Sequence, residues 1–224
     1  TAMKDLLGFK PGWGTTCGGI RACKNFVADA YCTYAERMEK AGAILIGKTN
    51  SPTMGLRGTC DNYLFGPSRN PFDLNKNTGG SSGGSAGAGL VPIAEGTDGG
   101  GSIRIPAAWT GTYGYKASFG RVPLLSPNAF AGDTPFILEG SITRTVSDAA
   151  LALEALAGYD ARDPYSLDEK IDFAATTTQS IKGWKIAFSM DLGYFEIDAE
   201  VQKNTRDALE VFKSLGCTVE EVEI

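Results

Sequence analysis

The sequence contains no histidine, and this absence excludes more chemistry than any other feature of its composition. Histidine is the commonest general base and the commonest protein ligand for metals, and it takes part in every Ser-His-Asp or Cys-His catalytic arrangement. Any nucleophilic catalysis by this chain therefore needs a different base. Lysine is the available residue.

Other absences narrow the class of protein. No run of lysines or arginines occurs in a chain of formal net charge −5, so neither nucleic acid nor an anionic membrane is indicated as a partner. The longest apolar stretches, 43–46 and 89–94, fall far short of the roughly 20 residues that span a bilayer. With no recognisable secretion signal, we expect a globular cytoplasmic protein.

The five cysteines do not form a disulfide or zinc pattern. Their number is odd and no two of them make a CxxC pair, so we expect free thiols. No cofactor and no metal is predicted. The cysteines are Cys17, Cys23, Cys32, Cys60 and Cys217.

Helical and strand-like patterns alternate along the chain, which predicts an α/β protein whose sheet is covered by helices on both faces. A polar, less ordered connection is expected over 159–182. The predicted elements are a helix over Asp29–Ala41, a buried strand over Ala43–Gly47, a helix with Ser147 as N-cap and Gly158 at its end, a strand over Trp184–Ser189, a helix over Val201–Leu215 and a strand over Thr218–Val222.

One short motif resembles a phosphate-binding loop. Gly42, Gly47, Lys48 and Thr49 match the pattern G-x-x-x-x-G-K-[ST]. The intervening residues 43–46 are all apolar and follow a predicted helix instead of a strand, so the required strand, loop, helix context is missing. We interpret the match as coincidental.

Two glycine-dense tracts carry the chemistry of the chain. Residues 79–85 and 96–102 flank an apolar segment, 90–94, so a folded core with turns fits better than a flexible linker. Ser102 follows three glycines and precedes a helical segment with Pro106, which places its hydroxyl beside free backbone N–H groups suited to an oxyanion. Arg104 is the only nearby cation, which favours hydroxyl chemistry over phosphate binding.

These tracts, Gly79–Ser85 and Gly96–Ala107, resemble the defining block of the amidase signature family. The resemblance implies a mixed, largely parallel β-sheet covered by helices on both faces, and an enzyme that hydrolyses an amide C–N bond of a small molecule through an acyl-enzyme. It also implies that residues 1–224 are one partial amidase signature domain, without the family's N-terminal helices and C-terminal half. Further similar segments follow in the family's order at Met3–Leu6, Gly47–Asn50, Gly66–Pro71 and Gly140–Val146.

The resemblance also implies residue roles. Ser102 is the expected nucleophile, Ser81 the second serine on a cis Gly80–Ser81 peptide, and Lys4 the base. Lys4 is expected in place of Lys48 because the family's lysine lies in a Lys-Asp pair, and its pKa must fall by burial from about 10.4. The backbone N–H groups of the expected oxyanion hole belong to Gly99, Gly100, Gly101 and Ser102, and the expected supporting residues are Thr97, Asp98 and Arg104.

Two alternative functions stay open. The family includes a glutamine-dependent aminoacyl-tRNA amidotransferase A-type subunit, in which a glutamine commonly stands where this chain has Ile105. A non-catalytic homologue is the other alternative, because Ser85–Gly89 is about three residues shorter than the family's usual helix. Three residues correspond to about 4.5 Å of helix, enough to displace Ser81 from Ser102.

Overall fold

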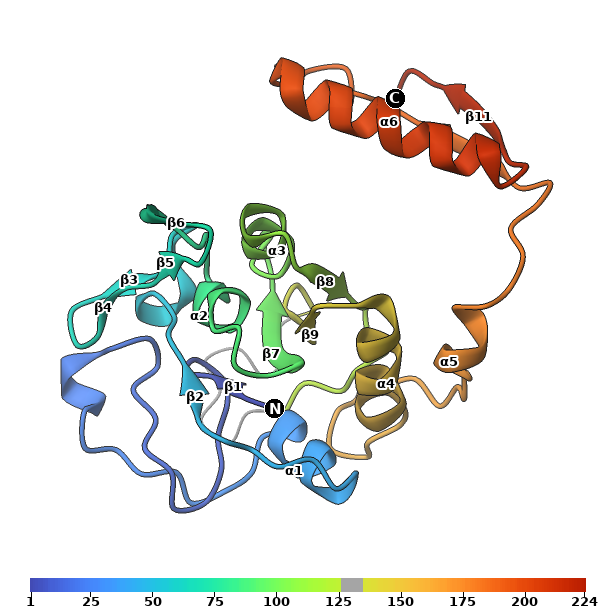
Figure 1. The fold of residues 1–224 in the computed structure, drawn as a ribbon. Helices are drawn as coiled ribbons and strands as arrows, with labels where there is room; N and C mark the ends of the chain where they lie inside the picture. The colour runs from blue at the N-terminus through green and yellow to red at the C-terminus, as the bar shows by residue number, and fades with distance from the viewer. Residues whose placement is uncertain (126–134) are drawn as a thin grey trace. The chain divides into compact units, whose positions relative to one another are not determined.

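The computed structural model describes residues 1–125 and 135–224, and the chain forms two compact units, Thr1–Thr177 and Thr178–Ile224 (Figure 1). Every predicted site residue belongs to the first unit. Within the described ranges, no helix combines the length and the apolar character needed to cross a membrane.

A mixed sheet forms the centre of the first unit. Its strands β7, β9 and β8 lie in that order and pair antiparallel. Strands β1 and β2 pair in parallel, and a parallel bridge between Ala2 and Ala94 joins β1 to β7. Most of the described pairing in this part of the chain is antiparallel, not largely parallel as expected, whereas the predicted mixed α/β class is confirmed. The strands are β1 Met3–Lys4, β2 Lys48–Thr49, β7 Ile93–Asp98, β8 Tyr113–Lys116 and β9 Leu138–Thr143.

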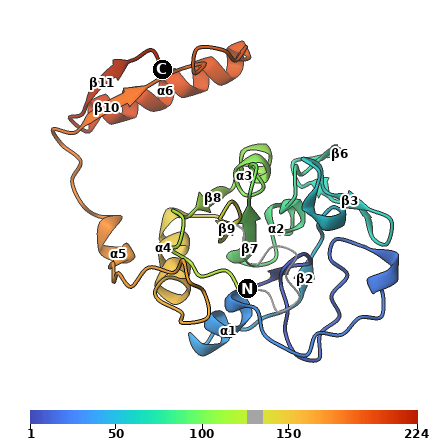
Figure 2. The same cartoon turned by 180° about the vertical axis from the view of Figure 1, so that it is seen from behind.

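Helices pack on both faces of this sheet, as predicted, and α2 and α4 lie on opposite sides of β7 in Figures 1 and 2. On one face Ala86 of α2 and Ile103 pack against Ile142 of β9. A side chain at Gly96 would collide with Ile103, so the close packing requires glycine there. On the other face Ile93 joins a larger cluster with α1 and α4. The helices of this unit are α1 Thr33–Lys40, α2 Gly83–Gly87, α3 Arg104–Thr110, α4 Val146–Leu156 and α5 Phe173–Thr176.

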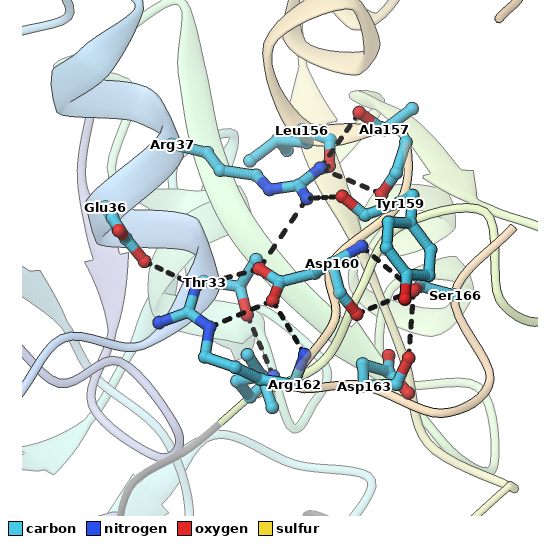
Figure 3. A network of polar contacts seen from close by, with 12 residues as sticks. Thr33, Glu36, Arg37, Leu156, Ala157, Tyr159, Asp160, Arg162, Asp163 and Ser166 are labelled. Atoms are coloured by element: carbon cyan, nitrogen blue, oxygen red, sulfur yellow. Dashed lines mark hydrogen bonds and ion pairs between the residues drawn. The ribbon is translucent and has the colours of Figure 1, made fainter. Parts of the chain in front are cut away.

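Arg37 of α1 fixes the end of α4 (Figure 3). Its Nη1 donates to the carbonyl oxygens of Leu156, Ala157 and Gly158 at 2.7, 2.9 and 3.1 Å, and its Nη2 donates to that of Tyr159 at 2.9 Å. The last carbonyls of a helix have no partner within the helix, and the guanidinium supplies the missing donors. Arg37 therefore ties two helices on the same face of the sheet.

Asp160 extends this connection (Figure 3). Its carboxylate lies 2.8 Å from Arg162 and 3.7 Å from Arg37, and Arg162 also pairs with Glu36 of α1 at 2.7 Å. Hydrogen bonds from Arg162 lower the pKa of Asp160 to about 2. The network holds the polypeptide after α4 against α1.

The remaining elements are small. In the second unit β10 (Lys185–Phe188) pairs in parallel with β11 (Thr218–Glu221), and α6 (Ala199–Ser214) forms the crossover, as the sequence predicts.

All five cysteines are free thiols, and three of them are buried. In the first unit, two antiparallel pairs and two 3₁₀ turns precede the glycine tracts: β3 (Asp61–Asn62) with β4 (Gly66–Pro67), β5 (Arg69–Asn70) with β6 (Asp73–Asn77), Arg21–Cys23 and Thr53–Gly55.

The predicted buried strand over Ala43–Gly47 is wrong. Only Leu45 is well buried, and Ile44 and Ile46 are exposed to 78% and 58%. The segment hydrogen-bonds to Thr1 along one side only, and regular pairing begins at Lys48. The segment therefore runs beside the first residues of the chain with two of its apolar side chains exposed, and it is not a strand buried between two neighbours.

Two predicted helix starts are also corrected. The first helix begins at Thr33 instead of Asp29, because the Cys32 thiol caps it by accepting the Ala35 N–H. The second has Thr145 as its N-cap instead of Ser147, since Thr145 Oγ1 accepts the N–H of Asp148 at 3.1 Å.

Candidate active site

Lys4 and Ser81 meet in the interior of the first unit. The Lys4 side chain exposes no surface, and its Nζ lies 2.7 Å from Ser81 Oγ and 2.9 Å from Thr97 Oγ1. Burial lowers the pKa of Lys4 to about 7, because loss of hydration outweighs the attraction of nearby acids such as Glu95 and Asp98. A large fraction of Lys4 is therefore a neutral amine near pH 7, in contact with a hydroxyl whose proton it can accept.

The peptide bond before Ser81 is cis, as expected. The backbone around it is tightly enclosed: a side chain at Gly80 would lie within 2.8 Å of the carbonyl oxygens of Arg57 and Thr59. Only glycine fits at that position. The glycine tract therefore lets the chain bring Ser81 against its neighbours at close range.

Ser82, which the sequence did not single out, connects the two glycine tracts. Its N–H donates to the carbonyl oxygen of Ser102 at 3.2 Å, and its hydroxyl bonds to the backbone of Thr97 at 3.3 Å. Ser102 itself is half-buried, and its hydroxyl has no hydrogen-bond partner among the described residues. The structure thus brings the Ser102 segment beside the Ser81 segment without a bond between the two hydroxyls.

Asp98 organises the turn that carries Ser102. Its Oδ1 accepts the N–H of Gly101 at 2.7 Å, its Oδ2 accepts that of Ile103 at 3.1 Å, and Arg104 binds both oxygens at 2.9 and 3.0 Å. Burial opposes the charge of Asp98, but these hydrogen bonds outweigh it and lower the pKa to about 2. The predicted supporting residues are thus together: Asp98 and Arg104 hold the turn, and Thr97 holds Lys4.

The predicted oxyanion hole needs one correction. The N–H of Gly101 is already engaged by Asp98, so it is not available to a substrate oxygen. In the part of the chain that the structure describes, the N–H groups of Gly99, Gly100 and Ser102 have no acceptor. Three of the four expected donors are therefore free, and Gly101 shapes the loop.

Lys48 is engaged elsewhere. Its Nζ forms an ion pair with Asp5 at 2.7 Å and donates to Thr15 Oγ1 at 2.8 Å, and both charged side chains are nearly buried. Asp5 is also bound by the N–H of Thr16. The two residues of the Lys-Asp pair at positions 4 and 5 therefore have different partners: Lys4 contacts Ser81, and Asp5 forms an ion pair with Lys48.

Two buried acids beside Lys4 were not predicted. Glu95 on β7 exposes no surface and accepts the backbone N–H of Lys4 at 2.7 Å through Oε2, and Glu139 on β9 is almost as buried. Alternation along β7 places Glu95 on the same face as the buried Ile93, and this alternation could have indicated that Glu95 is buried.

Comparison with known proteins identifies the family. The Amidase family model matches residues 1–224. The A-type subunit of the glutamyl-tRNA(Gln) amidotransferase from Chromohalobacter salexigens is 40% identical over 100% of this chain and 46% of its own length, and the acylamidase of Rhodococcus erythropolis is 38% identical over 98% and 46%. The crystal structure of a bacterial aryl acylamidase, an amidase signature enzyme, matches with a TM-score of 0.94 and 50% identity over 99% of this chain and 46% of that one.

The chain belongs to the amidase signature family. The predicted amidase signature fold is confirmed by the structural match, and the chain spans less than half the length of the relatives it matches.

The Ser85–Gly89 segment does not separate the expected triad residues. Ser85 Oγ donates to the carbonyl oxygen of Glu95 at 2.6 Å and shares a hydrogen bond with Thr49 Oγ1 at 2.8 Å, which fixes α2 to the sheet. The Lys4–Ser81 contact and the backbone bond to Ser102 both form. A loss of function through a displaced helix therefore finds no support in this geometry.

Proposed function

We propose that the protein hydrolyses amide C–N bonds with Ser102 as nucleophile, Ser81 as proton relay and Lys4 as base. The observation that carries the proposal is the buried contact of 2.7 Å between Lys4 Nζ and Ser81 Oγ, with the pKa of Lys4 lowered to about 7. This pair supplies the general base that a chain without histidine needs.

The reaction follows from this arrangement in two halves. Ser102 Oγ attacks the amide carbonyl carbon while its proton passes to Ser81 and the Ser81 proton passes to Lys4. The amides of Gly99 and Gly100, with that of Ser102, donate to the developing oxyanion. When the C–N bond breaks, the proton returns from Lys4 through Ser81 to the leaving nitrogen. Water then attacks the acyl-enzyme by the same relay and releases the carboxylate.

Hydrolysis is favoured over transamidation by the environment of Ile105. A Cβ built at Gly79 would lie 3.1 Å from Ile105 Cγ2, and one built at Gly101 would lie 2.8 Å from its Cδ1. Ile105 therefore fills the space between the two glycine tracts with apolar atoms. A glutamine side chain at position 105, which is common in the transamidating subunits, would replace these apolar atoms by an amide group.

Transamidation is the second candidate because several relatives of this chain are subunits of an amidotransferase. A relative 40% identical over the whole chain belongs to an aminoacyl-tRNA amidotransferase. This function requires glutamine as the amide substrate and further protein chains as partners. The hydrolase function requires only a small-molecule amide, and the five free thiols are compatible with the reducing cytoplasm predicted from the sequence.

The test compares amide substrates on the full-length protein. An aryl amide and glutamine are supplied separately, and the released amine or ammonia is measured for the wild type and for Ser102→Ala. The expected result is turnover of the aryl amide above that of glutamine, lowered on the order of 10³-fold or more in Ser102→Ala.

The exposed Ser147 provides a matched control. Ser147→Ala should keep wild-type turnover. A wild-type protein that hydrolyses neither amide contradicts the proposal, and one that releases ammonia from glutamine alone favours the transamidating function.

A further inference from the structure

The side chain of Glu95 takes the place of a backbone group between β1 and β7. After the Ala2–Ala94 bridge, a regular parallel ladder would continue with a bond from the Lys4 N–H to the Glu95 carbonyl oxygen. Instead, the Lys4 N–H donates to Glu95 Oε2 at 2.7 Å, and the Glu95 carbonyl accepts Ser85 Oγ. Glu95 therefore fixes the backbone of the residue proposed as the base.

Glu139 faces Glu95 across the β7–β9 ladder. Register places Glu95 opposite Ser141 and Glu139 opposite Thr97, so the two carboxyl groups are diagonal neighbours on one face of the sheet. Each carboxyl group affects the pKa of the other. Glu95 Oε1 has no donor among the amide, ammonium and hydroxyl groups of the described residues, so it is free to accept a proton from a neighbouring carboxyl group.

Two ionised carboxylates cannot both be accommodated there. The interior offers little solvent to either, and the charges of two diagonal neighbours on one face of a sheet repel. Burial and the neighbouring Glu95 charge raise the pKa of Glu139 well above its ordinary value, and burial raises that of Glu95 to about 7. This arrangement favours one proton shared by the two carboxyl groups, with Glu139 as the group that donates it to the free Oε1 of Glu95.

Most charged groups around the pair are neutralised by other partners. Lys48 is paired with Asp5, and Arg37 is bound by Asp160 and by the carbonyls after α4. Lys4 is the cation whose own charge varies near pH 7. The other titratable groups that face Lys4 or the pair are Cys32 and Tyr34, whose pKa values are raised by burial, together with Cys60 and the Arg104-bound Asp98.

We propose that Glu95 and Glu139 are positioning residues that share a proton, hold the Lys4 backbone and set the pH at which Lys4 becomes a neutral base. The inference rests on the proposed function. Ionised Glu95 stabilises the ammonium form of Lys4, and neutral Glu95 does not. Glu139, by donating to Glu95, favours the ionised form and so keeps Lys4 protonated to a higher pH.

The test is the pH dependence of kcat/KM for amide hydrolysis by the full-length protein. Glu95→Gln keeps an acceptor for the Lys4 N–H but removes the negative charge, so the acidic limb should move to lower pH by on the order of one unit. Glu139→Gln offers an amide N–H to Glu95 in place of the proton that Glu139 carries and leaves the pair with the same charge, so the limb should stay close to its wild-type position. Ser141→Ala removes the hydroxyl opposite Glu95 without changing charge, and should leave the limb in place.

If Glu95 and Glu139 had only a structural role, the two glutamine variants would be less stable, but the acidic limbs of their kcat/KM profiles would lie at the same pH. If the wild type hydrolyses amides but both glutamine variants shift the limb in one direction, or neither shifts it, the inference is overturned and the proposed function stands. If the wild type has no amide activity, the proposed function fails instead.

A spectroscopic readout is independent of activity. The infrared spectrum of the wild type at pH 7 should contain the carbonyl stretch of a buried protonated carboxylic acid, retained in Glu95→Gln and lost in Glu139→Gln. Absence of this band from the wild type overturns the proton-sharing pair even where a variant does not fold.

Discussion

The Nζ atom of Lys4 lies 2.7 Å from the Oγ atom of Ser81, where both side chains are almost entirely buried. The contact joins the Lys4 amine, which is partly neutral near pH 7, to the Ser81 hydroxyl. The next residue, Ser82, donates its backbone N–H to the carbonyl oxygen of Ser102. In the proposed function this arrangement supplies the base of a chain without histidine, and it gives Lys4 and Lys48 different partners.

Replacing each lysine by methionine should distinguish these functions. Lys4→Met removes the base, and amide turnover should fall by roughly 10² to 10⁴-fold. Lys48→Met leaves Asp5 buried without its partner, so the main effect should be a loss of roughly 3 kcal/mol or more of stability. Turnover and thermal unfolding of both variants provide the measurement, and a larger loss of turnover per folded molecule in Lys48→Met would reverse the assignment.

The same lysine should make stability depend on pH. Its pKa is lowered from 10.5 in the unfolded chain to about 7 in the folded one, so the unfolded state binds the extra proton between these values. Stability from Lys4 therefore rises with pH above 7, by at most about 1.4 kcal/mol per pH unit. Glu95, with its pKa raised from 4.5 to about 7, contributes the opposite slope below pH 7.

Denaturant unfolding of the full-length protein between about pH 7 and pH 8.5 isolates the lysine when the wild type is compared with Lys4→Met, since the opposite slope from the raised pKa of Glu139 is present in both proteins. The stability of the wild type should change with pH by a more positive slope than that of Lys4→Met, by at most about 1.4 kcal/mol per pH unit. Identical slopes in both proteins would mean that Lys4 titrates as an ordinary exposed lysine.

Much of the fold follows from local sequence, whereas the corrections arise from tertiary contacts. The β10, α6 and β11 order is visible in the spacing of apolar residues and in Gly216. The segment 43–47 looks equally apolar, but its burial depends on what covers it, which periodicity does not report. Thr145 and Cys32 cap their helices through single side-chain bonds that compete with several similar candidates nearby.

Replacing Asp98 should lower stability and turnover more than replacing Arg104, the arginine bound to it. Asp98→Asn places N–H donors against the N–H groups of Ile103 and Arg104, so we expect a loss of about 2 kcal/mol in stability and a clear fall in turnover. The Arg104 side chain is 57% exposed, and Arg104→Ala should cost about 1 kcal/mol or less. Unfolding and kinetics on both variants decide the order, and an equal or greater effect of Arg104→Ala would refute it.

Gly55 lies against the site with φ +71°, and Gly42 provides its control with φ +85° in open space. Alanine at either position should cost about 1 to 2 kcal/mol of backbone strain. At Gly55 the added carbon would also lie 2.8 Å from Leu6 Cδ2 and 3.4 Å from Ser81 Oγ, so Gly55→Ala alone should also lower turnover, by about tenfold. Equal turnover in the two variants would show that Gly55 is outside the working site.

The sequence predicts some residues of the candidate site and misses others, and the difference has a physical reason. Lys4, Ser81 and Ser102 lie in segments that resemble the family, so their expected roles follow from the sequence without any geometry. Glu95 and Glu139 are single acids within strands, and such residues usually face solvent. Their burial depends on a partner 44 positions away in the sequence and on a gap in the β1–β7 ladder, and only the folded arrangement contains either feature.

The central claim is that Ser102 is the nucleophile and that the Lys4–Ser81 pair activates it. The most direct measurement is labelling of the full-length protein by a fluorophosphonate, followed by mass-spectrometric mapping of the modified residue. We expect one adduct on Ser102, formed far more slowly in Lys4→Met and Ser81→Ala and absent in Ser102→Ala. An adduct on another serine, or undiminished labelling of Ser102→Ala, would contradict it.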